Sequence, residues 1–191
     1  VFLNGERGVH VVEALVKNFH QIQAVVGTSS LKSVFRENIN HFGLKFLKLD
    51  QVNKQVSTKI LAQNKPTLFI VAGFSQIFNS ELLQIPKLGT INLHAGKLPQ
   101  YRGGSPLNWQ LINGEVQAGV SVLKMDEGID SGEVLAEAAF PIEENDTIRD
   151  LHKKANGLFP ELVIKVLRNY DAGKYKGKLQ KESEACYWHQ R

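Results

Sequence analysis

The sequence predicts an α/β fold with a Rossmann-like, open and mostly parallel sheet that carries helices on both faces. Two observations support this. Short apolar segments alternate with helix-like segments along the first half of the chain, as in successive βαβ units. The segment from Thr67 to Val71 is almost entirely apolar and is bounded by Pro66 and Gly73, which is typical of a strand buried on both faces in a parallel sheet.

The first half of the chain supplies most of the expected sheet. An apolar pattern with helical spacing runs from Val9 to Phe19 and predicts a helix. The β-branched run from Ile22 to Val26 ends in a Gly/Ser-rich loop and predicts a strand. The other elements expected before residue 95 are strands at 1–3, 44–49, 67–71 and 88–93 and a helix at 52–63.

The pattern changes after Gly104. A short helix at 106–112 and two strands at 119–125 and 133–138, joined by the loop 126–132, are expected there. The residues before Ile148 are typical of a helix cap, and an apolar stripe follows them. Pro160 lies inside this stripe, so we expect a kink or a break in the helix. The Lys/Gly-rich residues 171–181 are expected to form a loop or linker.

Composition restricts the class of protein. With 191 residues, 42% of them hydrophobic, the chain can build the core of one domain. Its apolar runs are too short to span a membrane. Cys186 is the single cysteine, which predicts a reducing, cytoplasmic compartment and no disulfide. The net charge of +4 is spread along the chain, so nucleic acid is a poor candidate partner and a small anionic ligand a better one.

Several familiar site motifs are absent. The Gly-rich stretch at residues 5–8 is not G-x-G-x-x-G, and no P-loop is present. The segment Gly73-Phe74-Ser75-Gln76-Ile77 lacks the second glycine of a nucleophile elbow, so Ser75 is expected to be a loop residue. No Cys/His cluster has the spacing of a zinc site, and no metal is expected.

Two polar stretches are candidates for chemistry. Asn92 and His94 lie two residues apart, so they share one face at the end of an expected strand, where open α/β sheets bind ligands. The alternatives are that Asn92 caps the loop and His94 is a structural histidine. The second stretch, residues 126–132, packs three acids between two strands, and an acid there could orient an imidazole. Its alternative is ordinary turn chemistry.

Together these stretches resemble the formyltransferase family that uses 10-formyltetrahydrofolate. The matching motifs are Asn92-Leu93-His94, Leu98-Pro99-Gln100-Tyr101-Arg102-Gly103 and Ile129-Asp130-Ser131-Gly132. The good match runs from about Thr67 to Ala136, and weaker likeness extends to both ends. The resemblance implies a formyltransferase fold, 10-formyltetrahydrofolate as co-substrate, and Asn92, His94 and Asp130 as the catalytic residues.

The resemblance is strongest to the sugar N-formyltransferases. The Ala95-Gly96-Lys97 loop and the closing Trp188-His189-Gln190-Arg191 point to that branch. A dTDP-linked amino sugar is therefore the expected acceptor. Methionyl-tRNA formyltransferase is the nearest alternative, followed by a glycinamide ribonucleotide formyltransferase, a formyl-folate hydrolase or a non-catalytic folate- or nucleotide-binding module.

The resemblance also implies binding residues and a division of the chain. Residues expected to bind the folate are Phe74, Ser75, Gln76, Ile77, Asp126, Gly128 and Ile129. Residues expected to bind the acceptor are Lys97, Tyr101, Arg102 and Trp188. For Arg102 the alternative is a surface arginine that bonds loop carbonyls, and Trp109 is expected in the core. Residues 1–180 are expected to form the catalytic domain. Residues 181–191 are expected to begin a C-terminal extension that could form a homodimer contact.

Overall fold

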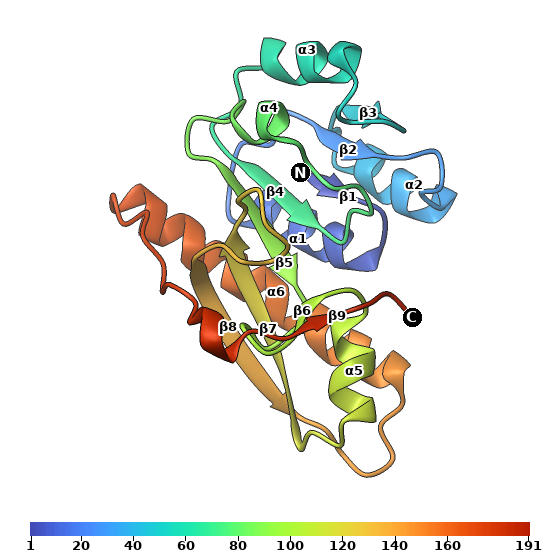
Figure 1. Cartoon of the computed structure of the whole chain (residues 1–191). Helices are drawn as coiled ribbons and strands as arrows, with labels where there is room; N and C mark the ends of the chain where they lie inside the picture. Colours follow the sequence, from blue (N-terminus) through green and yellow to red (C-terminus); the bar gives the residue numbers. More distant parts are fainter. The chain divides into compact units, whose positions relative to one another are not determined.

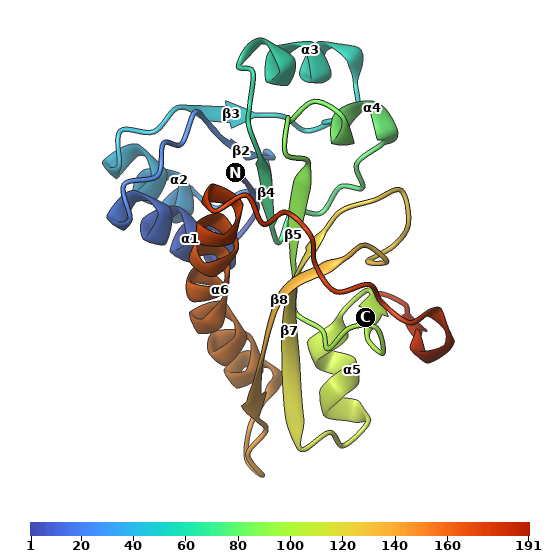
Figure 2. The same cartoon turned by 90° about the vertical axis from the view of Figure 1, so that its left-hand side faces the viewer.

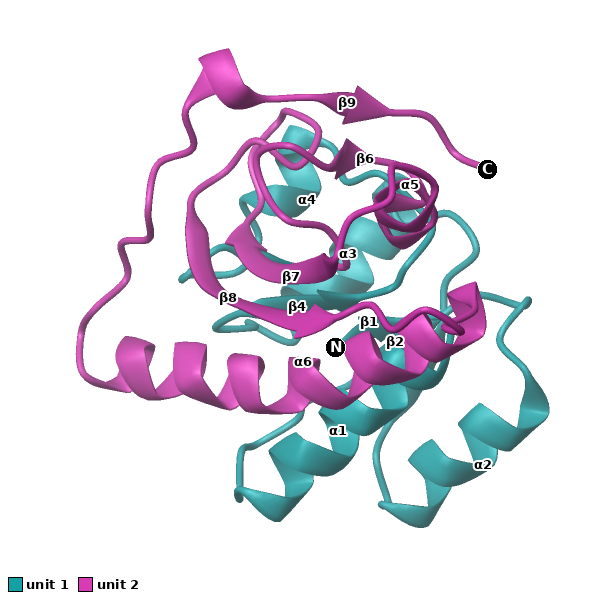
Figure 3. Cartoon of the chain, turned by 90° about the horizontal axis from the view of Figure 1, so that it is seen from below, with its two compact units in different colours: residues 1–92 teal, residues 93–191 magenta.

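A computed structural model describes all 191 residues (Figure 1). Its main sheet has the strand order β3-β2-β1-β4-β5-β7-β8, and a separate pair is formed by β6 and β9. Strand β1 pairs parallel with β2 and β4, β2 pairs parallel with β3, and β4 pairs parallel with β5, whereas β7 pairs with β8 antiparallel. The predicted open, mostly parallel sheet is therefore confirmed. The chain divides into two compact units, residues 1–92 and 93–191 (Figure 3).

The first unit contains a parallel sheet and the helices that connect its strands. Phe2 of β1 pairs with Val26 of β2 on one side and Val71 of β4 on the other. Helices α1 and α2 lie together on one face of the sheet (Figure 2). Helix α3 connects β3 to β4, and a right-handed crossover in this direction places it on the other face. The bounds are β1 Phe2–Leu3, α1 Glu6–Lys17, β2 Val25–Gly27, α2 Ser33–His41, β3 Phe46–Lys48, α3 Gln55–Gln63, β4 Phe69–Ala72, α4 Ser80–Leu83 and β5 Thr90–His94.

Close packing of α1 on β1 organises this unit. Leu3, Val12 and Val25 are fully buried members of one apolar cluster. Gly8 faces Leu3 so closely that a Cβ added to it would lie 2.1 Å from the Leu3 Cβ, so this approach needs glycine. Helix α1 begins at Glu6, three residues earlier than its apolar pattern predicts, because its first turn is polar.

The second unit consists of a hairpin, two helices and a short parallel pair. Its bounds are β6 Arg102–Gly103, α5 Pro106–Ile112, β7 Gln117–Lys124, β8 Val134–Pro141, α6 Ile148–Asp171, a 3-10 turn Glu182–Glu184 and β9 Tyr187–Trp188. In β6 and β9, Arg102 pairs with Tyr187 and Gly103 with Trp188. The C-terminal residues 181–191 are thereby joined to the loop that follows β5.

Helix α6 continues without a break through Pro160, so the break expected there is wrong. Nine buried residues hold the helix, among them Leu151, Phe159 and Val163, each 0% exposed. Their packing outweighs the hydrogen bond that a proline cannot donate. The predicted cap is confirmed, since the Asp150 carboxylate accepts the Thr147 backbone N–H at 2.9 Å.

The segment expected as a loop, 171–181, is largely irregular. Helix α6 extends to Asp171, and the residues after it contain one isolated bridge, in which Lys178 pairs antiparallel with Val134 at the start of β8. No helix in the structure combines the length and the apolar character that a membrane crossing requires.

Candidate active site

Strand β5 carries Asn92 and His94 at its C-terminal end. The period of two in a strand directs both side chains to the same side. The boundary between the two units falls directly after Asn92, so His94 belongs to the second unit. The His94 side chain is only 6% exposed, and a buried imidazole needs hydrogen-bonding partners.

Both ring nitrogens of His94 face oxygen atoms. Nδ1 lies 3.3 Å from Oδ2 of Asp130, and Nε2 lies 2.5 Å from the backbone carbonyl oxygen of Tyr101. A neutral imidazole donates from one nitrogen only, whereas an imidazolium donates from both. The ring is therefore held between a carboxylate oxygen and a carbonyl oxygen, both of which can accept a hydrogen bond.

The loop after β5 fits closely around this ring. A Cβ added to Gly96 would lie 2.5 Å from Nε2 of His94 and 2.6 Å from the carbonyl oxygen of Tyr101. The buried Ser121 on β7 donates its hydroxyl to the carbonyl of Gly96 at 2.9 Å. Glycine at this position therefore leaves room for the imidazole, and β7 fixes the loop that provides it.

Asp130 reaches His94 from a tightly folded turn between β7 and β8. Its backbone has a φ of +51°, a left-handed conformation that aspartate tolerates better than most residues. Oδ2 of Asp130 also accepts the Gly103 backbone N–H at 3.0 Å. Within the turn, Oδ1 of Asp126 accepts the Gly128 N–H at 3.0 Å and the Ser131 hydroxyl at 2.8 Å. The catalytic roles of these groups remain predictions.

The residues expected to bind the folate lie in both units. In the first, Phe74 packs edge-on against Phe2, and Ser75 and Gln76 have polar partners in neighbouring loops. Ile77 is 80% exposed. In the second, Asp126 and Gly128 stabilise the turn, and Ile129 is 56% exposed. The two isoleucines are the exposed large apolar side chains of this set, and Phe74 is half-buried.

Tyr101 and Trp188 form an internal stack. Their rings are 5.8 Å apart and inclined by 13°. The Tyr101 hydroxyl donates to Glu115 at 2.6 Å, and the Trp188 indole donates to the carbonyl of Gln100 at 2.9 Å. Burial, followed by the hydrogen bond to Glu115, raises the pKa of the Tyr101 phenol. Trp109, expected in the core, is half-buried and tilts against Trp188.

Arg102 differs from both interpretations of its sequence context. Its side chain is 1% exposed, so it is not a surface arginine. Its guanidinium donates to Gln180 at 3.1 Å, Glu182 at 2.8 Å and the Tyr187 hydroxyl at 2.5 Å. Burial acts to lower the pKa of Arg102, but the hydrogen bonds to Glu182 and Tyr187 outweigh it and the net pKa is raised. The guanidinium is committed to side chains of the C-terminal segment, and contact with a substrate anion would require breaking them.

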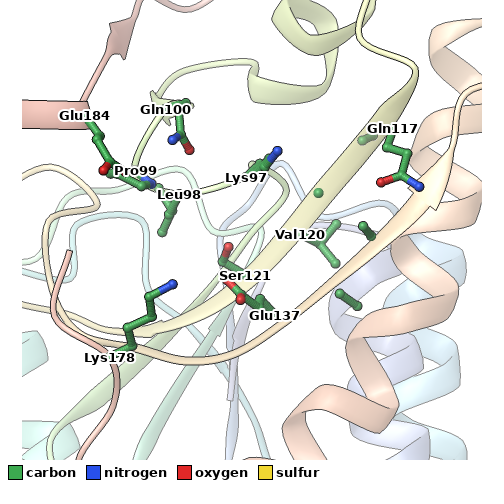
Figure 4. Close-up of a pocket in the computed structure, with 14 residues that line it drawn as sticks. Lys97, Leu98, Pro99, Gln100, Gln117, Val120, Ser121, Glu137, Lys178 and Glu184 are labelled. Atoms are coloured by element: carbon green, nitrogen blue, oxygen red, sulfur yellow. The ribbon is translucent and has the colours of Figure 1, made fainter. Parts of the chain in front are cut away.

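Lys97, by contrast, is exposed and borders a cavity of about 340 Å³ in the second unit (Figure 4). The residues from Lys97 to Gln100 form one wall, and the small residues of β7 and β8 form the floor. Lys178 and Glu184 lie at its edge. Within this wall, the Oε1 atom of Gln100 is buried without a hydrogen-bond partner.

Two contributors to the geometry were not anticipated from the sequence. The Gly103 amide binds Asp130, and the Gln180 side chain donates to the carbonyl oxygens of Asp130 and Gly132 at 2.8 and 2.7 Å. Gln180 lies in a Lys/Gly-rich stretch that carries no motif. Nothing local in the sequence could have identified it, because its contacts depend on pairing with residues about fifty positions away.

Comparisons with known proteins agree on one family. Residues 7–167 match the formyl transferase family. Methionyl-tRNA formyltransferase of Pelobacter propionicus is 39% identical over 137 residues, which covers 72% of this chain and 43% of that protein. The chain thus spans less than half the length of this relative.

Solved structures share the fold at lower identity. An N-formyltransferase from Helicobacter canadensis, in complex with folinic acid and dTDP-3-aminofucose, is 21% identical with a TM-score of 0.75, covering 98% of this chain and 69% of that one. Glycinamide ribonucleotide transformylase 1 from Symbiobacterium toebii is 19% identical with a TM-score of 0.77, covering 90% and 86%. With the match over residues 7–167, these findings show that the chain belongs to the formyl transferase family.

Proposed function

We propose that this protein transfers a formyl group from 10-formyltetrahydrofolate to an amine, with Asn92, His94 and Asp130 at the reacting centre. The observation that carries the proposal is the contact between Nδ1 of His94 and Oδ2 of Asp130 at 3.3 Å. Its histidine is buried and lies at the end of a strand that also bears Asn92. Family membership supplies the class of reaction.

The proposed chemistry needs no nucleophilic side chain. A neutral amine attacks the formyl carbon, and the new C–N bond forms while the carbonyl oxygen gains negative charge. The Asn92 amide and the His94 imidazolium supply hydrogen bonds and charge to this oxygen, and one such donor is typically worth about 3 kcal/mol of barrier. In the second half, the bond from carbon to N10 of the folate breaks.

Proton movement is assigned to His94 and Asp130. The attacking nitrogen loses one proton and the leaving N10 gains one, so the step is balanced without an outside acid. Asp130 keeps the ring oriented and can pass the proton through water. Nε2 of His94 contacts the carbonyl oxygen of Tyr101. Direct proton transfer from Nε2 to the substrate therefore requires this contact to be broken.

For the folate, we propose the segment 74–77 and the turn 126–129 as the binding residues. Ile77 and Ile129 are large apolar side chains that are 80% and 56% exposed. Exposed apolar surface of this kind is suited to a flat aromatic ring such as a pterin.

For the acceptor, we propose the amine of a nucleotide-linked amino sugar. The Ala95-Gly96-Lys97 loop and the closing Trp188-His189-Gln190-Arg191 support it. So does the Helicobacter canadensis enzyme, which covers 98% of this chain in a complex with dTDP-3-aminofucose. The exposed ammonium group of Lys97 could bind a diphosphate. The second candidate is methionyl-tRNA, because a methionyl-tRNA formyltransferase is 39% identical.

The two acceptors can be separated in one experiment. The full chain is incubated with 10-formyltetrahydrofolate, and tetrahydrofolate release is followed while dTDP-amino-deoxyhexoses or charged initiator tRNA are supplied separately. Release that depends on an amino sugar supports the proposal and identifies the substrate. Release that depends only on tRNA establishes the second candidate and excludes an amino sugar as the acceptor.

A further inference from the structure

The C-terminal segment reaches the turn that carries Asp130. Lys178 and Val134 exchange both backbone hydrogen bonds, at 2.9 and 2.8 Å, and the Gly177 N–H donates to the Glu133 carboxylate at 3.1 Å. These contacts place residues 177–180 alongside the start of β8. The next side chain in the segment that can donate to the turn is that of Gln180.

The Gln180 amide uses both of its ends. Its nitrogen donates to the carbonyl oxygens of Asp130 at 2.8 Å and Gly132 at 2.7 Å. Its oxygen accepts from Nε of the buried Arg102 at 3.1 Å. The side chain therefore connects the turn of Asp130 to an arginine that is itself fixed by Glu182 and Tyr187.

Asp130 needs such support for two reasons. Its φ of +51° is unfavourable for a residue with a side chain, so the surrounding contacts must hold it. Its carboxylate also has to meet two partners at once, the Gly103 N–H and the His94 ring. Gly103 follows Arg102 on β6, so Asp130 is tied to this strand directly through its carboxylate and indirectly through Gln180.

We propose that Gln180 is a positioning residue that sets the contact between Asp130 and His94. Its hydrogen bonds go to Arg102 and to the carbonyl oxygens of Asp130 and Gly132, so it acts on the imidazole through the backbone of the turn. This inference rests on the proposed function for its effect on catalysis, whereas its effect on the His94 environment stands by itself. Supporting groups of this kind decide whether a catalytic pair is held closely enough to react.

The test compares Gln180→Glu and Gln180→Leu with wild type in the full chain. Glu retains an oxygen that can accept from Arg102 but cannot donate to the carbonyl oxygens of Asp130 and Gly132. This variant therefore keeps the contact with Arg102 and loses the two hydrogen bonds to the turn. Leu removes both. Leu179→Ala is the matched control, because the neighbouring side chain is 75% exposed. The measurements are kcat, the two KM values, the thermal midpoint, and the ring-nitrogen NMR signals of His94, assigned with His94→Gln.

Gln180→Glu is expected to lower kcat about 10- to 100-fold through misplacement of Asp130, with both KM values within about twofold of wild type. The His94 signals should move in Gln180→Glu and Gln180→Leu and stay unchanged in Leu179→Ala. Unmoved His94 signals in Gln180→Glu overturn the proposal, whatever happens to kcat or the thermal midpoint. If wild type shows no formyl transfer, the proposed function fails, while moved His94 signals still establish the positioning role.

Discussion

At the scale of single residues, the candidate site is distinguished by the contacts that its side chains make, and not by the residue types alone. An Asn-x-His strand end or an Asp-rich turn taken alone fits ordinary structural roles. The buried His94 ring lies between the Asp130 carboxylate and the Tyr101 carbonyl. Unpaired, such a group would cost several kcal/mol of desolvation. The two contacts therefore hold the His94 ring in one orientation.

The first prediction concerns this pair. His94→Ala and Asp130→Asn should each reduce turnover by about two to four orders of magnitude, because each removes a charged or proton-transferring group from the transition state. Both proteins should remain folded, as judged by far-UV circular dichroism. Near-normal turnover in either variant removes that residue from the catalytic set.

The second prediction distinguishes a structural Arg102 from a substrate contact. Arg102→Ala should lower the free energy of unfolding by about 2–4 kcal/mol through loss of charged hydrogen bonds in a buried site. The share owed to Glu182 is small, because that side chain is 73% exposed and its pairing is screened. Urea denaturation, with the exposed Arg149→Ala as control, measures the change. An unaltered unfolding free energy with a raised acceptor KM would instead establish substrate contact.

At the scale of elements, the sequence predicted correctly those features that depend on neighbouring residues, such as helix bounds and helix caps. Helix α5 has the predicted bounds, Pro106–Ile112, and the cap of α6 is found where its Thr and Asp residues indicate. Helix α2 had no prediction, although Phe35, Ile39 and Phe42 have helical spacing and pack in one apolar cluster. The break expected at Pro160 is absent, because the packing of the buried residues of α6 outweighs the hydrogen bond that a proline cannot donate.

The pairing of β6 with β9 marks the limit of sequence reasoning about the site. Each strand is two residues long, so neither shows periodicity. Their partnership joins residues about 85 positions apart. The motif Tyr101-Arg102-Gly103 was recognisable in the sequence, yet the role of Arg102 depends on Gln180, Glu182 and Tyr187, which only the folded chain brings together.

The third prediction concerns the first turn of α6. The ammonium of Lys154, followed by the Glu143 N–H, lowers the pKa of Asp146 from 3.8. The Thr147 hydroxyl and N–H lower the pKa of Asp150. A lowered pKa in the folded state gives stability that is present above the unfolded value and lost as the pH falls through the folded one.

The free energy of unfolding should therefore decline as the pH falls below about 4. In Asp146→Asn this decline should be smaller and the stability at neutral pH lower. Denaturation curves between about pH 6 and pH 2 provide the measurement, with the neighbouring Glu144→Gln as control. Equal pH dependence in wild type and Asp146→Asn contradicts the role given to this carboxylate.

At the scale of the whole molecule, the candidate catalytic residues are distributed across two compact units. Asn92 ends the first, and His94 and Asp130 belong to the second. A single strand, β5, carries residues of both. The chain spans 43% of the Pelobacter propionicus relative. Formyl transfer is the reaction class of its family, and the amino-sugar acceptor is a proposal.

The central claim is formyl transfer to an amine through His94 and Asp130. The most direct measurement follows isotopically labelled formyl from 10-formyltetrahydrofolate in wild type and in His94→Ala. The account predicts amine-dependent appearance of the label on the acceptor, with release of tetrahydrofolate, and near-complete loss of both in the variant. Label recovered as free formate, independent of any amine, would show hydrolysis instead, and undiminished transfer by His94→Ala would contradict the proposed reacting centre.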